Sequence, residues 1–475
     1  MKKYIIPAML LLCGATIAQA KDVVLSGLSE KKVVTAAIQK AVDECSATGG
    51  GVVTIPSGNF TTGAIALKDG VELHLSKGTV LKGSTNHPDD YTQGRGVIVG
   101  KGVTGCAVTG FGVIDGQGWH ENFQRYGNNQ GNRPHALFFE DCKDVLVRDV
   151  HVRNAAWWSF RLFRCDGVTI DNVQVYSHSI VNNDGIDIDA RNVTISNCRI
   201  DSDDDGICLK SDDKNFICEN IAVTNCIIGS NCNAIKFGTS SYGGFRNVTI
   251  NNCVIHKPSE SNVWDWSKEY RGVNKGELTA LSGIAVECVD GGIIENINIS
   301  NISMTGVITP IFVCLNGRHG VGTMRNLIFQ NITAKATGMI PTLISGVPNG
   351  IIDGVVLRDI FVEHKGGGTL DDANTILRED LKGYPENRMY GKVNPANGLY
   401  VRHAKNVTVD NFRVVLQGDD ARATVVMNDV SSSAIESISI NERCTNENLI
   451  KLRNCKDVTI NEAYRKVTEQ VTINP

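Results

Sequence analysis

Two clusters of aspartates near the middle of the chain carry its clearest chemical signal. Asp184 lies in the segment Asn-Asn-Asp-Gly-Ile-Asp, and Asp204 and Asp205 lie in the segment Asp-Asp-Asp-Gly-Ile-Cys a short distance further on. Hydrolysis of a glycosidic bond needs two carboxyl groups close together, one protonated as an acid and one ionised as a base. These three aspartates are therefore candidate catalytic residues. The alternative is that they cap turns, where the side chain bonds to nearby backbone amides.

The elements that would position these carboxylates follow from a phrase that recurs along the chain. Apolar and polar residues alternate, an Asn or Asp follows, and a second short apolar run ends the phrase, as in VTIDNVQV at 168–175 and VTINNCVI at 248–255. The Asn or Asp recurs every ~23 to 30 residues, with one longer gap, a spacing typical of repeat architectures. These turn residues are Asp149, Asn172, Asn197, Asn225, Asn252, Asn301, Asn331 and Asp359.

A strand–turn–strand unit of this size cannot bury both of its faces alone, so the units must stack. Parallel strands stacked ~4.8 Å apart would enclose one continuous core, with aligned Asn side chains hydrogen-bonding from coil to coil and aligned Val, Ile and Cys inside. A β-sandwich would not repeat one phrase in the same order, and the leucine pattern of leucine-rich repeats is absent. The sequence therefore predicts an all-β fold, a parallel β-helix, in which the candidate aspartates lie at corresponding edges of adjacent coils.

The start of the chain reads as an export signal. Residues 1–20 hold two lysines, an apolar run and a cleavage-like Ala-Gln-Ala, which is the pattern of a secretory signal peptide. A short buried strand is the alternative. We expect a bacterial protein exported to the periplasm or the medium.

The remaining residues, 21–475, are predicted to form one β-helix domain. Its N-terminal cap would span about 22–62, and the amphipathic pattern at 31–45 predicts a helix that covers the first coil. Segments 256–280 and 364–397 lack the repeat and carry several aromatic residues. We expect them to be long loops that project from the coils, where clefts are usually built.

Charge and hydropathy exclude several classes of partner. A formal net charge of -4 gives no support for binding to nucleic acid or to an anionic membrane. Beyond the signal, no apolar run approaches the ~18 residues of a membrane span. We expect a monomer without membrane insertion.

The cysteines are expected to be structural. Cys198, Cys226 and Cys253 occupy the same place in successive phrases, which indicates stacked, buried thiols that act as small apolar residues. Cys444 and Cys455 form a candidate disulfide, because exported proteins often contain them. The sequence shows no CxxC pair and no zinc-like spacing, so neither a metal nor an organic cofactor is predicted.

The aspartate motifs, set on a β-helix, resemble those of glycoside hydrolase family 28, the polygalacturonase group of pectin hydrolases. The resemblance extends over about residues 30–430, from the entry segment GGGVVTIPSGNF through Arg133-Pro134 and Trp157-Trp158. It implies a right-handed β-helix of the pectin-lyase type and hydrolysis with inversion at the anomeric carbon. It also implies Asp204 as the general acid, with Asp184 and Asp205 activating the water.

Two further motifs of that family are changed in this chain. Asn233 stands where the family has the His of Gly-His-Gly, and Ala285 and Glu287 stand where it has the Arg and Lys of Arg-Ile-Lys. In polygalacturonases this Arg and Lys bind the galacturonate carboxylate, which a glutamate would repel. The pattern resembles the rhamnogalacturonan-active members better. The predicted substrate is therefore rhamnogalacturonan or a decorated galacturonide, and the alternative is an exo- or endo-acting polygalacturonase.

An anionic pectic chain requires cations and sugar-binding side chains around the acids. Lys210 and Lys236 fall within the motif strands, and Arg318 lies in a later loop. Glu287 would join the acid–base set, accept hydrogen bonds from sugar hydroxyls, or pair with one of the two lysines. The predicted substrate-binding residues are Asn182, Lys210, Asn233, Lys236, Glu287, Arg318 and Trp158.

Two rival functions use the same fold. A pectate lyase would need calcium and an Arg base, and no Arg lies among the aspartates. A non-catalytic glycan-binding β-helix would use the aspartates only as turn caps.

Overall fold

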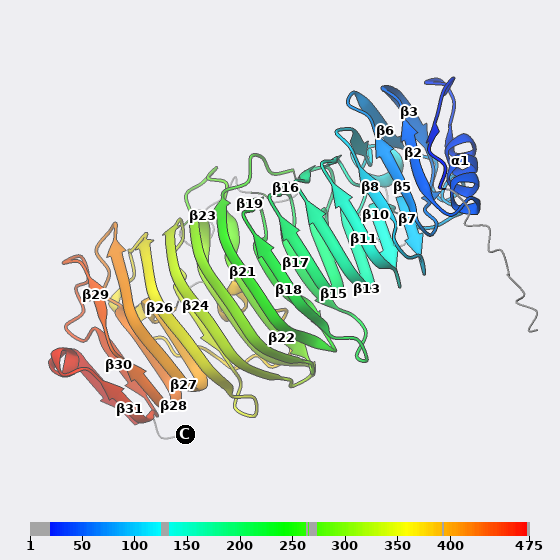
Figure 1. The fold of residues 1–475 in the computed structure, drawn as a ribbon. Coiled ribbons are helices and arrows are strands. Elements are labelled where there is room, and N and C mark those ends of the chain that lie inside the picture. The colour runs from blue at the N-terminus through cyan, green and yellow to red at the C-terminus, as the bar shows by residue number, and fades with distance from the viewer. Residues whose placement is uncertain (1–19, 125–132, 263–264, 266–272, 392–393, 473–475) are drawn as a thin grey trace, which may run out of the picture.

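The computed structural model shows a long, slightly curved stack of coils (Figure 1). It describes residues 20–124, 133–262, 265, 273–391 and 394–472. The predicted signal peptide therefore lies outside the described residues, save for Ala20. So do Trp264, Trp266, Tyr270 and Arg271 of the expected loop at 256–280.

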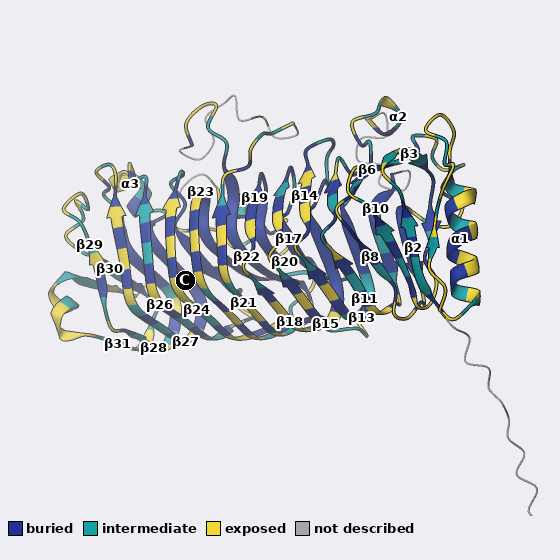
Figure 2. Ribbon diagram, turned by 45° about the horizontal axis from the view of Figure 1, so that its top comes forward, coloured by how far each residue is buried: buried dark blue, intermediate teal, exposed yellow. Residues whose placement is uncertain are grey.

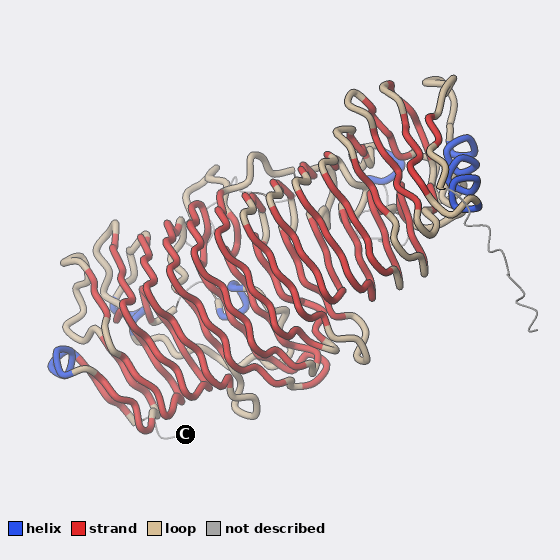
Figure 3. The backbone as a smooth tube through the Cα atoms, in the orientation of Figure 1, coloured by secondary structure: helices blue, strands red, loops and turns tan. Residues whose placement is uncertain are grey.

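Every strand pair is parallel, and the described strands belong to one continuous sheet that winds around the core. Figure 3 shows these strands side by side along the length of the molecule. The early coils hold β1 (Val23–Val24), β2 (Gly51–Ile55), β3 (Gly58–Thr62), β4 (Ile65–Ala66), β5 (Val71–Leu75), β6 (Thr79–Gly83), β7 (Gly96–Lys101), β8 (Ala107–Thr109), β9 (Val113–Asp115), β10 (His135–Glu140), β11 (Lys143–Arg148) and β12 (His151–Arg153).

The middle coils hold β13 (Phe160–Asp171), β14 (Gln174–Ser177), β15 (Ile186–Ser196), β16 (Arg199–Ser202), β17 (Ile207–Ser211), β18 (Cys218–Thr224), β19 (Ile227–Ser230), β20 (Asn233–Ser241), β21 (Gly244–His256) and β22 (Ala280–Asp290). The late coils hold β23 (Ile293–Gly320), β24 (Thr323–Ala336), β25 (Thr342–Ser345), β26 (Ile352–His364), β27 (Ala396–Leu416), β28 (Ala423–Ile435), β29 (Ile438–Ile440), β30 (Ile450–Arg453), β31 (Lys456–Ile460) and β32 (Thr468–Val471). The predicted right-handed parallel β-helix is confirmed.

The recurring Asn and Asp residues are the corners of the coils. All eight predicted turn residues adopt a positive φ, between 51° at Asn172 and 67° at Asp149. Asparagine and aspartate tolerate this left-handed conformation better than other side-chain-bearing residues. Their side chains also bond from coil to coil, as Asn331 Nδ2 does to Asn301 Oδ1 (2.7 Å) and Asn301 Nδ2 to Asn252 Oδ1 (3.2 Å). The corners therefore set the register of the stack.

The interior is a single column of Val, Ile, Leu, Phe and Cys side chains that runs through the coils. Figure 2 shows the resulting alternation of buried and exposed residues along the strands. Cys198, Cys226 and Cys253 are buried in this column, as predicted. The candidate disulfide between Cys444 and Cys455 is wrong, because both are free thiols, as are the other cysteines of the described residues.

One helix covers the N-terminal end of the stack (Figure 1). This helix, α1, spans Thr35–Ala47, so it begins and ends later than the predicted 31–45. The sequence also places Val33, Ile38, Ala41 and Val42 on one apolar face of this helix. Ile38, Ala41 and Val42 are buried, whereas Val33 precedes the helix and is exposed. Cys45 completes the buried face instead. No helix within the described ranges is long and apolar enough to cross a bilayer.

The expected loop at 364–397 lies between β26 and β27 and contains two short helical turns. They are α3 (Leu370–Ala373) and a 3-10 turn at Asn387–Tyr390. Two other short helices are α2 (Glu121–Gln124) and a 3-10 turn at Glu462–Val467. We call residues 377–390 the insertion, because they pack on the outer face of β22 and of the late coils that follow it.

Candidate active site

The three candidate aspartates lie in turns that stack directly on one another. The Gly185 amide donates to the Asp205 carbonyl (2.8 Å), and the Gly206 amide donates to the Asn233 carbonyl (2.9 Å). The stacking is so close that a Cβ at Gly185 would lie 2.4 Å from the Gly206 carbonyl oxygen, and one at Gly206 would lie 2.6 Å from that of Ala234. Glycine after each aspartate is therefore a packing requirement of the stacked turns.

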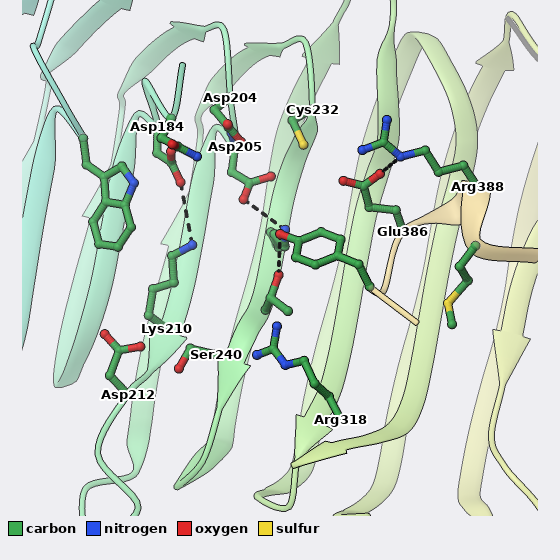
Figure 4. A pocket seen from close by; sticks show the side chains of 16 residues that line it. Asp184, Asp204, Asp205, Lys210, Asp212, Cys232, Ser240, Arg318, Glu386 and Arg388 are labelled. Atoms are coloured by element: carbon green, nitrogen blue, oxygen red, sulfur yellow. Dashed lines mark hydrogen bonds and ion pairs between the residues drawn. The ribbon is translucent and has the colours of Figure 1, made fainter. Parts of the chain in front are cut away.

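The aspartates open into a cavity of ≈ 580 Å³ on the outer face of the coils (Figure 4). Its lining residues are Trp158, Asn182, Asp184, Asp204, Asp205, Lys210, Asp212, Cys232, Lys236, Thr239, Ser240, Arg318, Tyr384, Glu386, Arg388 and Met389. All three aspartates thus line one cavity. Two of them also bond to the backbone of the turns: Asp204 Oδ1 accepts from the Asp205 amide (2.9 Å), and Asp205 Oδ1 accepts from the Asn233 amide (3.2 Å).

Two buried lysines lie between the carboxylates. Lys210 Nζ is 3.7 Å from Asp184 Oδ2 and 3.3 Å from Asp187 Oδ1. Lys236 Nζ is 3.2 Å from Asp205 Oδ2. Burial disfavours any charge that lacks a partner, so each ammonium and its carboxylates compensate one another.

This arrangement pushes the pKa values of the two adjacent aspartates apart. Burial raises the pKa of Asp204 to about 7, and the neighbouring charge of Asp205 adds to the shift. The pKa of Asp205 is lowered although this residue is buried, because Lys236 and Lys210 stabilise its charge. Asn233 contributes through a hydrogen bond from Nδ2 to Asp205 Oδ1 (2.9 Å). Near neutrality the pair therefore holds one acid and one base.

Asp184 differs from both. Its pKa is raised well above the usual range by burial and by the charges of Asp187 and Asp204, against the opposing effect of Lys210. Among the described residues, its Oδ1 is buried without a hydrogen-bond partner. Asp184 therefore holds a proton more readily than an ordinary aspartate, and it faces the cavity.

One group of side chains among the described residues has the spacing of a metal site. Ligand atoms of Asp204, Asp205 and Cys232 lie within 4.8 Å of one another. The Lys236 ammonium already neutralises Asp205, and burial raises the pKa of the Cys232 thiol well above its usual value, which keeps it neutral. Metal ligands must be deprotonated, so this set is a poor cation site.

Comparison with known proteins agrees with this geometry. The model of the family Glycosyl hydrolases family 28 matches residues 45–262, a range that contains all three aspartates. The match spans a little under half of the chain and includes the aspartate motifs, so the resemblance to glycosyl hydrolase family 28 expected from them is confirmed. The chain is a glycosidase.

Relatives of this family 28 chain are named as polygalacturonases. It is similar to the exopolygalacturonase of Platanus acerifolia, with 24% identity over 68% of this chain and 84% of the relative. It is also similar to exopolygalacturonase B of Aspergillus niger, with 23% identity over 58% of this chain and 64% of the relative, so it spans less than two thirds of that protein. Among solved structures, an exopolygalacturonase from Thermotoga maritima superimposes with a TM-score of 0.60 at 22% identity, over 73% of this chain and 87% of that one. This likeness shows a shared fold.

The family 28 site brings together five of the seven predicted substrate-binding residues. Asn182, Lys210, Lys236, Arg318 and Trp158 line the cavity. The ring of Trp158 lies under Lys210, with Nζ 5.0 Å from its centroid. Arg318 forms a two-bond pair with the buried Asp290, at 2.9 and 2.6 Å.

The other two predicted residues lie behind the lining. Asn233 is buried against Asp205, which it orients. Glu287 is fully buried, and its carboxylate lies 3.9 Å from Lys236 Nζ. Of the roles left open for Glu287, the structure shows the ion pair with a lysine. Neither residue lines the cavity in this conformation. Asn233 and Glu287 therefore support Asp205 and Lys236 instead of contacting the substrate directly.

Eight lining residues were not predicted as site residues from the sequence. Four of them belong to the coils: Asp212, Cys232, Thr239 and Ser240. The other four come from the insertion: Tyr384, Glu386, Arg388 and Met389. Figure 4 shows Glu386 and Arg388 across the cavity from Asp184. The aromatic and charged residues in this non-repeating segment were the available signal, but nothing in the spacing placed them at this site. None of the described residues of 256–280, the other expected loop, lines the cavity.

Proposed function

We propose that this protein hydrolyses glycosidic bonds of pectic galacturonan, with Asp204 as general acid and Asp205 as general base. The observation that carries the proposal is the opposite shift of the two pKa values within one cavity. Asp204 holds a proton near neutrality and donates it to the leaving oxygen. Asp205 is ionised and takes a proton from the attacking water.

Asp184 completes the proposed set from the preceding coil. Its carboxyl group faces the same cavity as the pair, so it contacts the water or the sugar at the cleaved bond. Lys210, at 3.7 Å, keeps it in place. We propose that Asp184 orients the water while Asp205 receives the proton.

Inversion at the anomeric carbon is part of the proposal and has a direct test. Inverting glycosidases usually hold their acid and base ~6.5–9.5 Å apart, whereas retaining enzymes hold them ~5–5.5 Å apart. An oxygen of Asp204 and one of Asp205 lie within 4.8 Å in the unliganded site. The anomer released first, followed by NMR, distinguishes the two outcomes, and a retained configuration would assign Asp205 or Asp184 as a nucleophile.

The proposed substrate is polygalacturonan, the alternative left open by the sequence, rather than rhamnogalacturonan. Proteins of similar sequence are named as exopolygalacturonases. The missing Arg and Lys at Ala285 and Glu287 are offset by two arginines that line the cavity from elsewhere, Arg318 and Arg388. Export through a signal peptide to a compartment that contains pectic chains, and action as a single-domain monomer, belong to the same proposal.

The test is an assay on purified protein with homogalacturonan and with rhamnogalacturonan, each with and without a calcium chelator. We expect saturated products from homogalacturonan, unaffected by the chelator. Asp204→Asn should lower kcat by about 10²–10⁴ and leave the fold intact. Unsaturated, chelator-sensitive products would assign a lyase instead. Binding without cleavage of either glycan would assign a glycan-binding protein.

A further inference from the structure

One outward-facing column of side chains crosses the site from coil to coil, and its chemistry changes abruptly after Lys236. The paired positions run Asp187, Cys208, Lys236, Ala285, Phe312, Leu343, Tyr400 and Val426. The column is polar or ionisable up to Lys236. From Ala285 onward it is apolar and buried, although it still points away from the core of the β-helix.

The insertion covers the apolar half of this column. Ala285, Phe312 and Leu343 belong to a second hydrophobic cluster, separate from the core, which includes Leu377 and Tyr390 of the insertion. Polar contacts hold the cover in place. Asn387 Nδ2 donates to Thr309 Oγ1 (3.0 Å), and Arg402 Nη1 donates to the Leu377 carbonyl (3.2 Å). A sugar chain cannot lie on these coils, because protein occupies the face.

The edge of this cover is the far wall of the cavity. Tyr384 stands on it, more than half exposed. Its hydroxyl accepts a hydrogen bond from Thr239 Oγ1 (3.1 Å), and its ring centroid lies 5.9 Å from Lys236 Nζ. Behind it, the buried Glu386 forms an ion pair with Arg388. Figure 4 shows Glu386 and Arg388 on the side of the cavity opposite Asp184.

We propose that this wall ends the substrate cleft immediately after Lys236, so that the site accepts only the end of a chain, and that Arg388 binds the acidic group of the terminal sugar. The inference rests on the proposed function and adds a mode of action and a specificity-determining residue. Cleavage then releases one short product at a time from one end.

Arg388 has the chemistry for this role. Its side chain remains about one third exposed at the wall (36%) while Glu386 holds it through Nε. A guanidinium carries five N–H donors in a planar fork that suits a carboxylate. Arg318 is less suited, because Asp290 already binds it through two hydrogen bonds. Lys210 and Lys236 are buried and paired with the acids of the site.

The mode of action is tested with galacturonide oligomers of defined length, labelled at the reducing end. End-directed cleavage is expected to shorten each oligomer stepwise, and to lower the viscosity of homogalacturonan little while reducing ends accumulate. Early products of every intermediate length, with a rapid fall in viscosity, would overturn the inference and leave the proposed hydrolysis intact. Absence of hydrolysis on every pectic substrate would overturn the proposed function as well.

The role of Arg388 is tested by Arg388→Gln, with Arg378→Gln as the matched control. Arg378 lies in the same insertion but its side chain is 78% exposed and does not line the cavity. Arg388→Gln should raise KM by about tenfold or more for oligomers with a free terminal carboxylate, with little change in kcat. KM for oligomers methyl-esterified at that carboxylate should stay unchanged. Equal effects on both oligomers, or an equal effect of Arg378→Gln, would overturn the assignment.

Discussion

The Lys236 ammonium lies 3.2 Å from an Asp205 oxygen and 3.9 Å from one of Glu287, and its side chain is almost fully buried. Two buried carboxylates therefore share one positive charge. Asp205 receives most of the benefit, because its pKa is lowered while burial raises the pKa of Glu287 to about 8. The ionised base of the proposed mechanism thus depends on a lysine one coil away.

Lys236→Met should remove that support. Without the ammonium, burial would raise the pKa of Asp205, so fewer molecules would hold an ionised base. We expect kcat/KM to fall by about 100-fold or more, and the acidic limb of the pH profile to move to higher pH. Lys236→Arg, which keeps the charge, should retain a profile of nearly normal shape. A Met variant with an unshifted profile would contradict the role.

The pH dependence of the native enzyme follows from the same pair. Activity requires Asp204 protonated and Asp205 ionised. The pKa of Asp204 is about 7 and that of Asp205 lies below its ordinary 3.8. Activity should therefore be level between about pH 4 and 6, fall to about half near pH 7 as Asp204 loses its proton, and fall at low pH only when Asp205 gains one. Measurements of kcat/KM from pH 3 to 9 check this, and activity that still rises above pH 8 would contradict it.

Stability should decrease as the pH rises. In the folded protein the pKa of Glu287 is about 8, above its ordinary 4.5. Such a group stabilises the fold fully below pH 4.5, and this contribution is lost as the pH rises through about 8. Asp204 and Asp189, each with a pKa of about 7, act in the same direction.

Glu287→Gln isolates one part of that effect. The neutral amide cannot ionise, so the melting temperature of the variant should drop less between pH 5 and 9 than that of the native protein. We expect a difference of a few degrees by calorimetry. Identical slopes for the two proteins would show that Glu287 does not titrate in this range.

The free cysteines make a prediction of their own. Because the described cysteines form no disulfide, a reducing agent should leave the melting temperature unchanged. Thiol titration in denaturant, without reductant, should detect at least the fourteen free thiols seen in the structure. A lower count would indicate a disulfide, with Cys444 and Cys455 the first pair to examine by mass spectrometry.

The coils and the acids could be predicted from sequence because both leave local, periodic signals. Asn172 and Asn301 occupy the same place in the repeated phrase, and both adopt the left-handed conformation of a corner. Gly206 follows Asp205 directly in the sequence. Once the repeat is recognised, stacking brings the aspartates of neighbouring coils together. These inferences require no knowledge of the distant parts of the chain.

The wall of the cavity could not be predicted in the same way. Tyr384 contacts Thr239 across 145 residues of sequence, and no periodicity links the two. The position of Glu287 could not be predicted from sequence either. Its position in a motif suggested a place at the substrate, but the insertion buries that coil and leaves Glu287 beside Lys236 instead.

Because the insertion docks on the coils from outside, catalysis and substrate selection depend on different segments of the chain. The reacting acids belong to coils near the centre of the chain, whereas the surface that decides which molecules may enter is added from a stretch that begins after β26. Evolution, or an engineer, could exchange that stretch for a shorter one and convert a trimming enzyme into one that cuts within a polymer, with the chemistry left untouched.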